Sequence, residues 1–364
     1  MLEFGLADAA DDEALRDLLR RTPMPGEIAL AFLREPSFFV AGRAGSVESQ
    51  TIVCRDSEGG AVVGVGERSI RRAYVDGQPT ALGYLSNLRG AVEWRKGLGL
   101  ARGYRHLRSL HADGQAQFYV TTILEENAYA VALLTSGRAS LPTYEHVATL
   151  ITYLIPVHRR RPARASFVER VRPDGMRDTL ACLDAWNRRH QFAPAYEHDD
   201  LAGLTGLLPD FSSENLYAAR DGDRVVGTLG VWDQSAFKQT VVSSYSRLLT
   251  LARPLYNAYA ALRGVPGLPG AGTELRLLYG GFLSAVDDAS DTAGALLERA
   301  LADCSGRGAS YLVLGLAERH PLSAAFAGHA ARRLRSNVYA VYWADEGVPG
   351  FDRGRPVHLE VATL

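Results

Sequence analysis

The segment Arg95-Lys96-Gly97-Leu98-Gly99-Leu100-Ala101 has the residue types and spacing best suited to ligand chemistry in this sequence. Glycines let the backbone turn tightly, and a helix that begins at such a turn presents unpaired N–H groups and the positive end of its dipole. Arg95 and Lys96 add two mobile positive charges. The pattern indicates an anion site suited to a pyrophosphate, and a plain glycine turn before a helix is the open alternative.

The spacing of this segment excludes two familiar phosphate motifs. Arg102, not glycine, stands three residues after Gly99, so the GxGxxG pattern of a dinucleotide fold is absent. No Gly-Lys-Ser or Gly-Lys-Thr follows either, which excludes a P-loop. At the corresponding place in the second half of the chain stand Asp287, Asp288 and Asp291. We expect these carboxylates to repel a pyrophosphate and to cap a helix.

Other catalytic classes lack their motifs. The sequence has no GxSxG elbow and no HExxH pair. Its three cysteines, Cys54, Cys182 and Cys304, lie more than a hundred residues apart, which fits neither a disulfide framework nor a zinc site. We therefore expect free thiols and no metal.

Composition limits the class of protein. The chain has 364 residues, of which 47% are hydrophobic and 22% charged, with a net charge of −1. Such a chain is long enough for two globular domains, and it has no global basic field for a nucleic acid or a membrane surface. Its first residues do not resemble a signal peptide, and its most apolar stretch, 147–157, is too short to cross a bilayer. We expect a cytoplasmic protein without nucleic-acid or membrane partners.

The elements that must position the glycine segment are strands and helices in alternation. Pro25 stands where first-turn prolines stand, so we expect a short helix over 25–32 after a first helix near the N-terminus. Turn signals, among them Asp76-Gly77, and apolar alternation then predict strands, with helices before and after the fourth of them. The expected strands are 50–55, 61–75, 80–89, 117–124 and 144–156, and the expected helices run from the glycine segment to 111 and over 127–135.

The second half repeats this order. Expected strands lie at 166–171, 216–220, 224–232 and 274–286, with helices at 175–191 and 200–208. Val62-Val63-Gly64 and Val225-Val226-Gly227 fall on equivalent strands, and an extra segment, 248–272, contains a helical stretch. The element order predicts two α/β domains, each with a mixed sheet packed between helices. Their expected bounds are 1–156 and 166–364, with the basic run at 157–165 as a linker.

Strand residues 82–89, the glycine segment and Asn127 at the start of the next helix together resemble the GCN5-related N-acetyltransferase (GNAT) superfamily, as a tandem two-domain member. The resemblance implies mixed, mainly antiparallel sheets flanked by helices, and acyl-CoA as co-substrate. Leu88 and Arg89 would offer backbone groups to the pantetheine and the acyl carbonyl, and Asn127 would contact the pantetheine arm. The pyrophosphate would rest on the loop that comprises Arg95, Lys96, Gly97, Leu98, Gly99, Leu100 and Ala101.

The resemblance leaves the proton-transferring groups open. The family often has a tyrosine seven residues after the asparagine, as general acid to the leaving thiolate, but here that residue is Leu134. Tyr129 and Tyr144 are nearby substitutes for this acid. For both, the alternative is an aromatic side chain that only packs against its neighbours. Glu67 on the expected strand 61–75 is the candidate general base, and an exposed strand residue without a catalytic role is the alternative. Asn87 could orient a water or the substrate.

The function implied by the resemblance is transfer of acetyl from acetyl-CoA to a primary amine of a small molecule or peptide. We expect direct attack in the first half, while the second half has lost cofactor binding. The alternative is a non-catalytic acyl-CoA-binding or regulatory module with the same tandem fold.

Overall fold

The computed structural model describes residues 2–91, 99–138, 141–158 and 167–364. Arg95, Lys96, Gly97 and Leu98 of the expected phosphate loop, and most of the expected linker, lie outside these residues. The described strands are β1 (Leu2–Leu6), β2 (Ile28–Leu33), β3 (Glu48–Asp56), β4 (Val62–Val75), β5 (Gln78–Gly90), β6 (Tyr119–Leu124), β7 (Thr143–Pro156), β8 (Val168–Arg170), β9 (Leu216–Asp221), β10 (Arg224–Trp232), β11 (Gln239–Tyr245), β12 (Glu274–Leu275), β13 (Leu277–Ala285), β14 (Tyr311–Ala317) and β15 (Arg332–Tyr342). The described helices are α1 (Asp12–Arg21), α2 (Phe38–Arg43), α3 (Gly99–His111), α4 (Ala128–Leu134), α5 (Met176–Asn187), α6 (His198–Leu201), α7 (Arg247–Arg263) and α8 (Ser290–Gly306).

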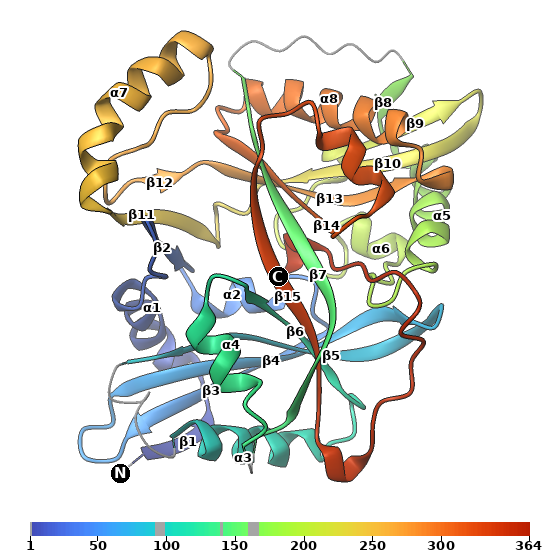
Figure 1. Cartoon of the computed structure of the whole chain (residues 1–364). Coiled ribbons are helices and arrows are strands. Elements are labelled where there is room, and N and C mark those ends of the chain that lie inside the picture. Colours follow the sequence, from blue (N-terminus) through green and yellow to red (C-terminus); the bar gives the residue numbers. More distant parts are fainter. Residues whose placement is uncertain (1, 92–98, 139–140, 159–166) are drawn as a thin grey trace.

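Twelve of the described strands form one continuous sheet in the order β1-β3-β4-β5-β6-β15-β7-β14-β13-β10-β9-β8 (Figure 1). The two sheets that the element order predicts are thus joined into one. Read from either end, five strands of one half are followed by the last strand of the other half. β15 lies between β6 and β7, and β7 lies beside β14. Because each half is completed by the other half's final strand, the two halves are expected to fold and unfold together.

The sheet is mixed and mainly antiparallel, as expected for the fold class. Parallel pairing joins β5 to β6 and β13 to β14, while the other named strand pairs are antiparallel. β4 and β5 form the longest hairpin, and the sequence predicted its turn at Asp76-Gly77. Both turn residues have positive φ, 53° and 78°, which matches the right-handed twist of a hairpin.

The expected helix over 25–32 is wrong: these residues include β2, which pairs antiparallel with β11 of the second half. Pro25 resembles a helix start, but Ile28–Leu33 is a short apolar run that periodicity alone cannot assign. Pairing with a strand more than two hundred residues away decides it. The expected helix over 200–208 is likewise reduced to the four residues of α6.

Helices cover both faces of the sheet in the first half, and successive residues of β3 pack against opposite helical layers. Ile52 packs in the cluster that contains Tyr104 and Leu107 of α3. Val53, on the opposite face, packs with Leu15 and Leu18 of α1. The two-residue period of a strand thus assigns one face to α3 and the other to α1 and α2.

The repeat seen in the sequence has a structural counterpart. Gly64 of β4 lies opposite Gly90 of β5, and Gly227 of β10 lies opposite Ala285 of β13. Next to each pair the register of the two strands shifts, between Val65 and Glu67 in β4 and between Thr228 and Gly230 in β10. No helix in the described part of the chain is long and apolar enough to cross a membrane.

Candidate functional site

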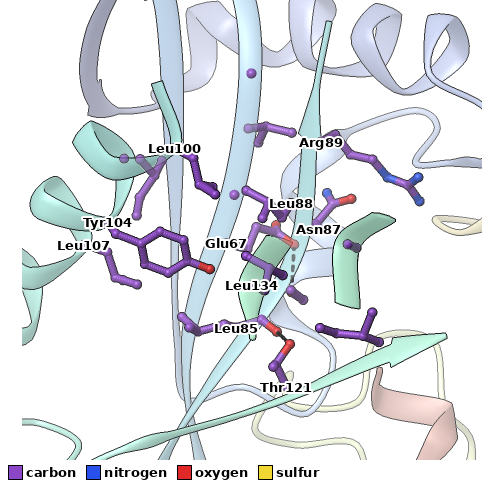
Figure 2. A pocket seen from close by; sticks show the side chains of 18 of the residues that line it. Glu67, Leu85, Asn87, Leu88, Arg89, Leu100, Tyr104, Leu107, Thr121 and Leu134 are labelled. Atoms are coloured by element: carbon purple, nitrogen blue, oxygen red, sulfur yellow. Dashed lines mark hydrogen bonds between the residues drawn. The ribbon is translucent and has the colours of Figure 1, made fainter. Parts of the chain in front are cut away.

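The first half contains a cleft where two parallel strands separate. β5 and β6 pair at Gly83 with Tyr119 and at Tyr84 with Val120. The Thr121 hydroxyl then donates to the Leu85 carbonyl over 2.7 Å. Beyond these residues the register records no further pairing of the two strands, although β5 continues to Gly90 and β6 to Leu124. Figure 2 shows side chains of both strands pointing into the space between them.

A β-bulge shapes the wall that β5 gives to this cleft. Val65 lies opposite Arg89 and Glu67 opposite Ser86, so Asn87 and Leu88 together face the single residue between them on β4. Asn87 has a φ of 54°, the left-handed conformation that places the extra residue of a bulge. Neither Asn87 nor Leu88 has a partner in the described register of β4 or β6. The bulge therefore leaves Asn87 and Leu88 outside the described pairing of β5 with β4 and β6.

The cleft opens into a cavity of about 290 Å³ that reaches from the bulge to α3 and α4. Its lining is mainly apolar, and it receives residues from β1, β3, β4, β5, β6, β7 and β15 besides the two helices. The side chains that form its apolar wall include Phe4, Ile52, Cys54, Val65, Leu85, Leu100, Leu107, Ile123, Leu124 and Leu134. A cavity with these walls and a few polar groups at one edge suits an extended ligand that is partly apolar.

Several of the predicted cofactor residues come together here. Leu88, Arg89, Leu100 and Asn127 all line the cavity. Gly99, Leu100 and Ala101 form the first turn of α3, and Gly99 is buried. Asn127 also caps α4, because its Oδ1 accepts a hydrogen bond from the Ala130 N–H over 3.2 Å.

Glu67 lies at the cavity but is not an exposed strand residue. Its side chain is only 3% exposed, and its two oxygens accept hydrogen bonds from the Arg34 guanidinium over 2.6 and 2.7 Å. The Ser86 hydroxyl lies 3.4 Å from one of these oxygens. A proton taken up by Glu67 would therefore weaken a bidentate ion pair.

The two tyrosine candidates differ in position. Tyr129 is 58% exposed and does not line the cavity. Tyr144 does line it, and its hydroxyl is hydrogen-bonded to that of Tyr104 on α3. Burial raises the pKa of Tyr104 to about 12 and that of Tyr144 well above its usual value. Both hydroxyls are thus neutral near pH 7, and in the bond between them one hydroxyl donates to the other.

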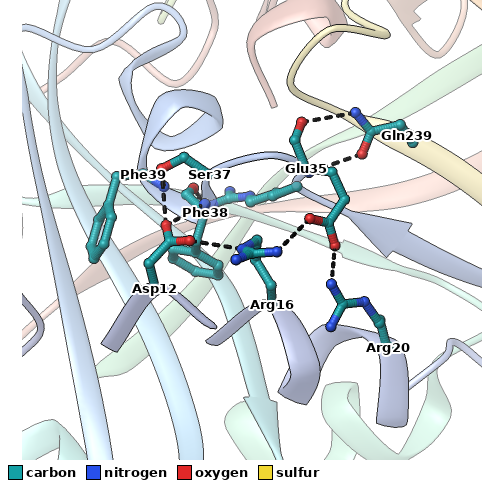
Figure 3. Close-up of polar contacts among 9 residues, drawn as sticks. Asp12, Arg16, Arg20, Glu35, Ser37, Phe38, Phe39 and Gln239 are labelled. Atoms are coloured by element: carbon teal, nitrogen blue, oxygen red, sulfur yellow. Dashed lines mark hydrogen bonds and ion pairs between the residues drawn. The ribbon is translucent and has the colours of Figure 1, made fainter. Parts of the chain in front are cut away.

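A polar network that spans both halves fixes Glu35, the residue next to Arg34 in the chain (Figure 3). Arg16 of α1 bonds Asp12 over 2.7 Å and Glu35 over 2.6 Å. Gln239 of β11 brackets the main chain of Glu35, accepting from its N–H and donating to its carbonyl, both over 3.0 Å. Because Arg34 adjoins this fixed residue and its guanidinium lies 4.6 Å from the Phe38 ring, it reaches Glu67 from a rigid support.

The second half has the same strand geometry, but its cleft is filled. Phe282 of β13 has a φ of 59° in the equivalent bulge, and β13 pairs with β14 only over Leu277–Tyr279. Residues 359–363 lie beyond this pairing, with Glu360 and Ala362 next to Gly281 of β13 and Val361 next to Gly315 of β14. The Glu360 carboxylate accepts the Phe282 N–H over 2.7 Å, and burial raises the pKa of Glu360 to about 7.

The three aspartates that follow β13 do not cap α8 as expected. Ala289 is the N-cap residue of that helix and has no side chain to bond it. Asp288 instead accepts the indole N–H of Trp186 over 2.8 Å, with Arg189 at 3.3 Å. Asp288 is thus held by Trp186 of α5 and by Arg189 just after that helix. Helix-capping preferences, which are local, do not reveal such a tertiary contact.

The sequence analysis missed three residues of the site. Arg34 follows the segment that was expected to be a helix, Tyr104 lies on α3, and Ser336 comes from β15 near the far end of the chain. Arg34 and Ser336 reach the site through pairings between the two halves, for which the sequence offers no local signal. Among the described residues, no group of three or more His, Cys, Asp or Glu side chains is arranged to hold a metal ion.

Comparison with known proteins places this fold. No family model and no curated protein sequence matches the chain. Saccharomyces cerevisiae N-myristoyltransferase with bound myristoyl-CoA is similar over 98% of this chain and 89% of its own, with a TM-score of 0.61 and 10% identity. The GCN5-related glucosamine N-acetyltransferase region of a fungal multi-domain GH3 β-N-acetylglucosaminidase gives a TM-score of 0.63 and 11% identity over 94% of this chain.

The match to the glucosamine N-acetyltransferase region spans only 38% of the fungal chain that contains this region. A GCN5-related N-acetyltransferase from Anabaena variabilis covers 93% of this chain and 72% of its own, with a TM-score of 0.50 and 11% identity. The chain therefore has the fold of the GCN5-related N-acetyltransferases and of N-myristoyltransferase, and this likeness extends over nearly its whole length.

Proposed function

We propose that this protein is a cytoplasmic acyl-CoA-dependent N-acyltransferase that moves acetyl from acetyl-CoA to a primary amine of a small molecule or peptide. The observation that carries the proposal is the open cleft between β5 and β6 with its bulge at Asn87 and Leu88. The equivalent cleft in the second half is filled by the chain's own residues 359–363, which supports assigning the reaction to the first half. This assignment gives the expected domains, 1–156 and 166–364, different roles.

The cofactor would enter along β5. In this proposal the pantetheine arm follows the main chain at Leu88 and Arg89, and the Asn127 amide contacts it from α4. The pyrophosphate would lie at the N-terminus of α3, where the helix dipole and unpaired N–H groups favour an anion. Arg95, Lys96, Gly97 and Leu98 precede this turn in the sequence and complete the proposed cradle with Gly99, Leu100 and Ala101.

The reaction would be a direct attack. The amine nitrogen forms a bond to the thioester carbon, the C–S bond breaks, and the amine proton must leave while the thiolate must be protonated. Main-chain N–H groups of the bulge would stabilise the oxyanion of the tetrahedral intermediate. We assign protonation of the thiolate to Tyr144, because its neutral hydroxyl lines the cavity. Glu67 would accept the amine proton, directly or through a water, at the expense of its pairing with Arg34.

A second candidate is a non-catalytic acyl-CoA-binding or regulatory module. Two observations favour it: Glu67 is already ion-paired, and Leu134 occupies the place where the family often has its acid. Both candidates require the same cavity, so binding alone does not separate them.

The test is turnover. Thiol release from acetyl-CoA would be followed with a panel of primary amines, and the acyl chain would be lengthened in steps because the cavity wall is largely apolar. We expect amine-dependent release that falls about 100-fold in Tyr144→Phe, the scale of a lost general acid, with little change in Tyr129→Phe. Acetyl-CoA binding without turnover on any amine would favour the regulatory module.

A further inference from the structure

The α7 helix presents an apolar face to solvent. Leu248, Leu251, Leu255 and Leu262 are 77%, 80%, 78% and 87% exposed. Their spacing of three, four and seven residues places them on one side of the helix, with Tyr256 and Tyr259 beside them. Tyr259 is itself 55% exposed.

The opposite face of α7 is bonded to the rest of the protein, and these contacts fix which face of the helix points to solvent. Asn257 bonds Leu268 twice, donating to its carbonyl over 3.0 Å and accepting its N–H over 2.7 Å. The Arg253 guanidinium donates to the Pro269 carbonyl over 3.1 Å, and Ala260 is buried. The return segment after the helix thus holds its polar side inward. Figure 1 shows α7 on the outside of the small sheet β12-β11-β2, away from the twelve-stranded sheet.

The size of the stripe calls for a partner. Six large apolar side chains with this exposure amount to a continuous patch on the order of 600 Å², at the upper end of what a monomeric soluble protein usually exposes. None of these six residues lines the cavity of the first half. The stripe is therefore separate from the proposed acyl-CoA site.

The charges around the stripe indicate what the partner is. Residues 234–273 contain no Asp and no Glu, although the whole chain has 41 acidic residues. Arg247 and Arg263, at the two ends of α7, are both exposed. A second copy packed through its own α7 would place arginine against arginine, whether the two helices ran parallel or antiparallel, because the helix offers no carboxylate. Like charges brought together at an interface destabilise it.

We propose that α7 docks on the surface of an anionic lipid bilayer, with its axis parallel to the membrane. The leucines would enter the boundary of the acyl chains, the tyrosines would lie at the headgroups, and Arg247 and Arg263 would pair with anionic headgroups. The sequence analysis expected no membrane partner, because it considered net charge and spanning length. Neither quantity reveals a stripe that the fold leaves exposed.

Vesicle flotation of the full chain tests this proposal. We expect the protein to float with phosphatidylcholine vesicles that contain 30% phosphatidylglycerol, and at least tenfold less with pure phosphatidylcholine. Leu251→Glu/Leu255→Glu should abolish flotation. The matched control Leu204→Glu/Val348→Glu adds the same two charges at residues that are 74% and 66% exposed elsewhere, and it should float like the wild type.

A second variant guards against misfolding of the first. Arg247→Glu/Arg263→Glu keeps the leucines and should remove the preference for the anionic vesicles. Equal flotation of the wild type and Leu251→Glu/Leu255→Glu would overturn the proposal, as would a wild type that floats with neither vesicle. A dimer in light scattering that Leu251→Glu/Leu255→Glu dissociates, without any flotation, would show instead that a second copy covers α7.

Discussion

Replacing Arg34 with alanine removes the ion-pair partner of a carboxylate, Glu67, that the fold buries almost completely. The side chains of Arg34 and Glu67 are 16% and 3% exposed, and two hydrogen bonds join them over 2.6 and 2.7 Å. Removing one partner of a buried ion pair leaves a desolvated charge, which typically costs about 3–5 kcal/mol. We therefore expect Arg34→Ala to lose about 4 kcal/mol of the free energy of unfolding.

The origin of this loss can be isolated by a second substitution. Gln at position 67 needs no counter-charge, so Arg34→Ala/Glu67→Gln should be about 2 kcal/mol more stable than Arg34→Ala alone, although it carries one more change. Urea unfolding at pH 7.5, followed by far-UV circular dichroism, gives all the values. Arg21→Ala is the matched control, because its pair with Asp17 is exposed by about half on both sides and should be worth less than 1 kcal/mol.

The reasoning is refuted if Arg34→Ala loses no more than Arg21→Ala. It is also refuted if the Glu67→Gln change fails to restore stability in the Arg34→Ala background. Either result would mean that water or another group compensates the negative charge of Glu67 when Arg34 is absent.

Two further predictions concern the strands behind the clefts. Gly83→Ala should cost about 3 kcal/mol in urea unfolding, because its Cβ would lie 2.6 Å from Cε1 of the buried Tyr119, whereas Gly59→Ala meets nothing and should be neutral. Glu360 has its pKa raised to about 7 by burial, above about 4.3 in the unfolded chain, so its stabilising effect is complete below pH 4 and is lost as pH rises through 7. Relative to Glu360→Gln, the wild type should lose roughly 3 kcal/mol between pH 4 and pH 8, and parallel pH profiles would contradict this.

Local sequence signals predicted most of the strands. β3, β4, β5, β6 and β7 lie within a few residues of their expected ranges, because turn residues such as Asp76-Gly77 and two-residue alternation act over short distances. β2 was mistaken for a helix, because its identity depends on pairing with β11 in the other half. The exchange of β7 and β15 between the halves leaves no local trace in the sequence either.

The site divides in the same way. Leu88, Leu100 and Asn127 were found through a family resemblance carried by consecutive residues, and the structure places all three at one cavity. The sequence analysis missed Ser336 and Arg34, because Ser336 reaches this cavity and Arg34 reaches Glu67 only through tertiary pairing. Glu67, the candidate general base, lines the cavity, but its burial and its ion pair depend on a side chain 33 residues away.

The central claim, that the first-half cleft binds acyl-CoA, is tested most directly by isothermal calorimetry with acetyl-CoA. Ala130 lines the cavity, whereas Ala128, on the same helix, is exposed and does not. We predict one site per chain with micromolar affinity, about −8 kcal/mol, that is lost in Ala130→Trp and kept in Ala128→Trp. No binding by the wild type, or equal affinity in Ala130→Trp, would contradict the account.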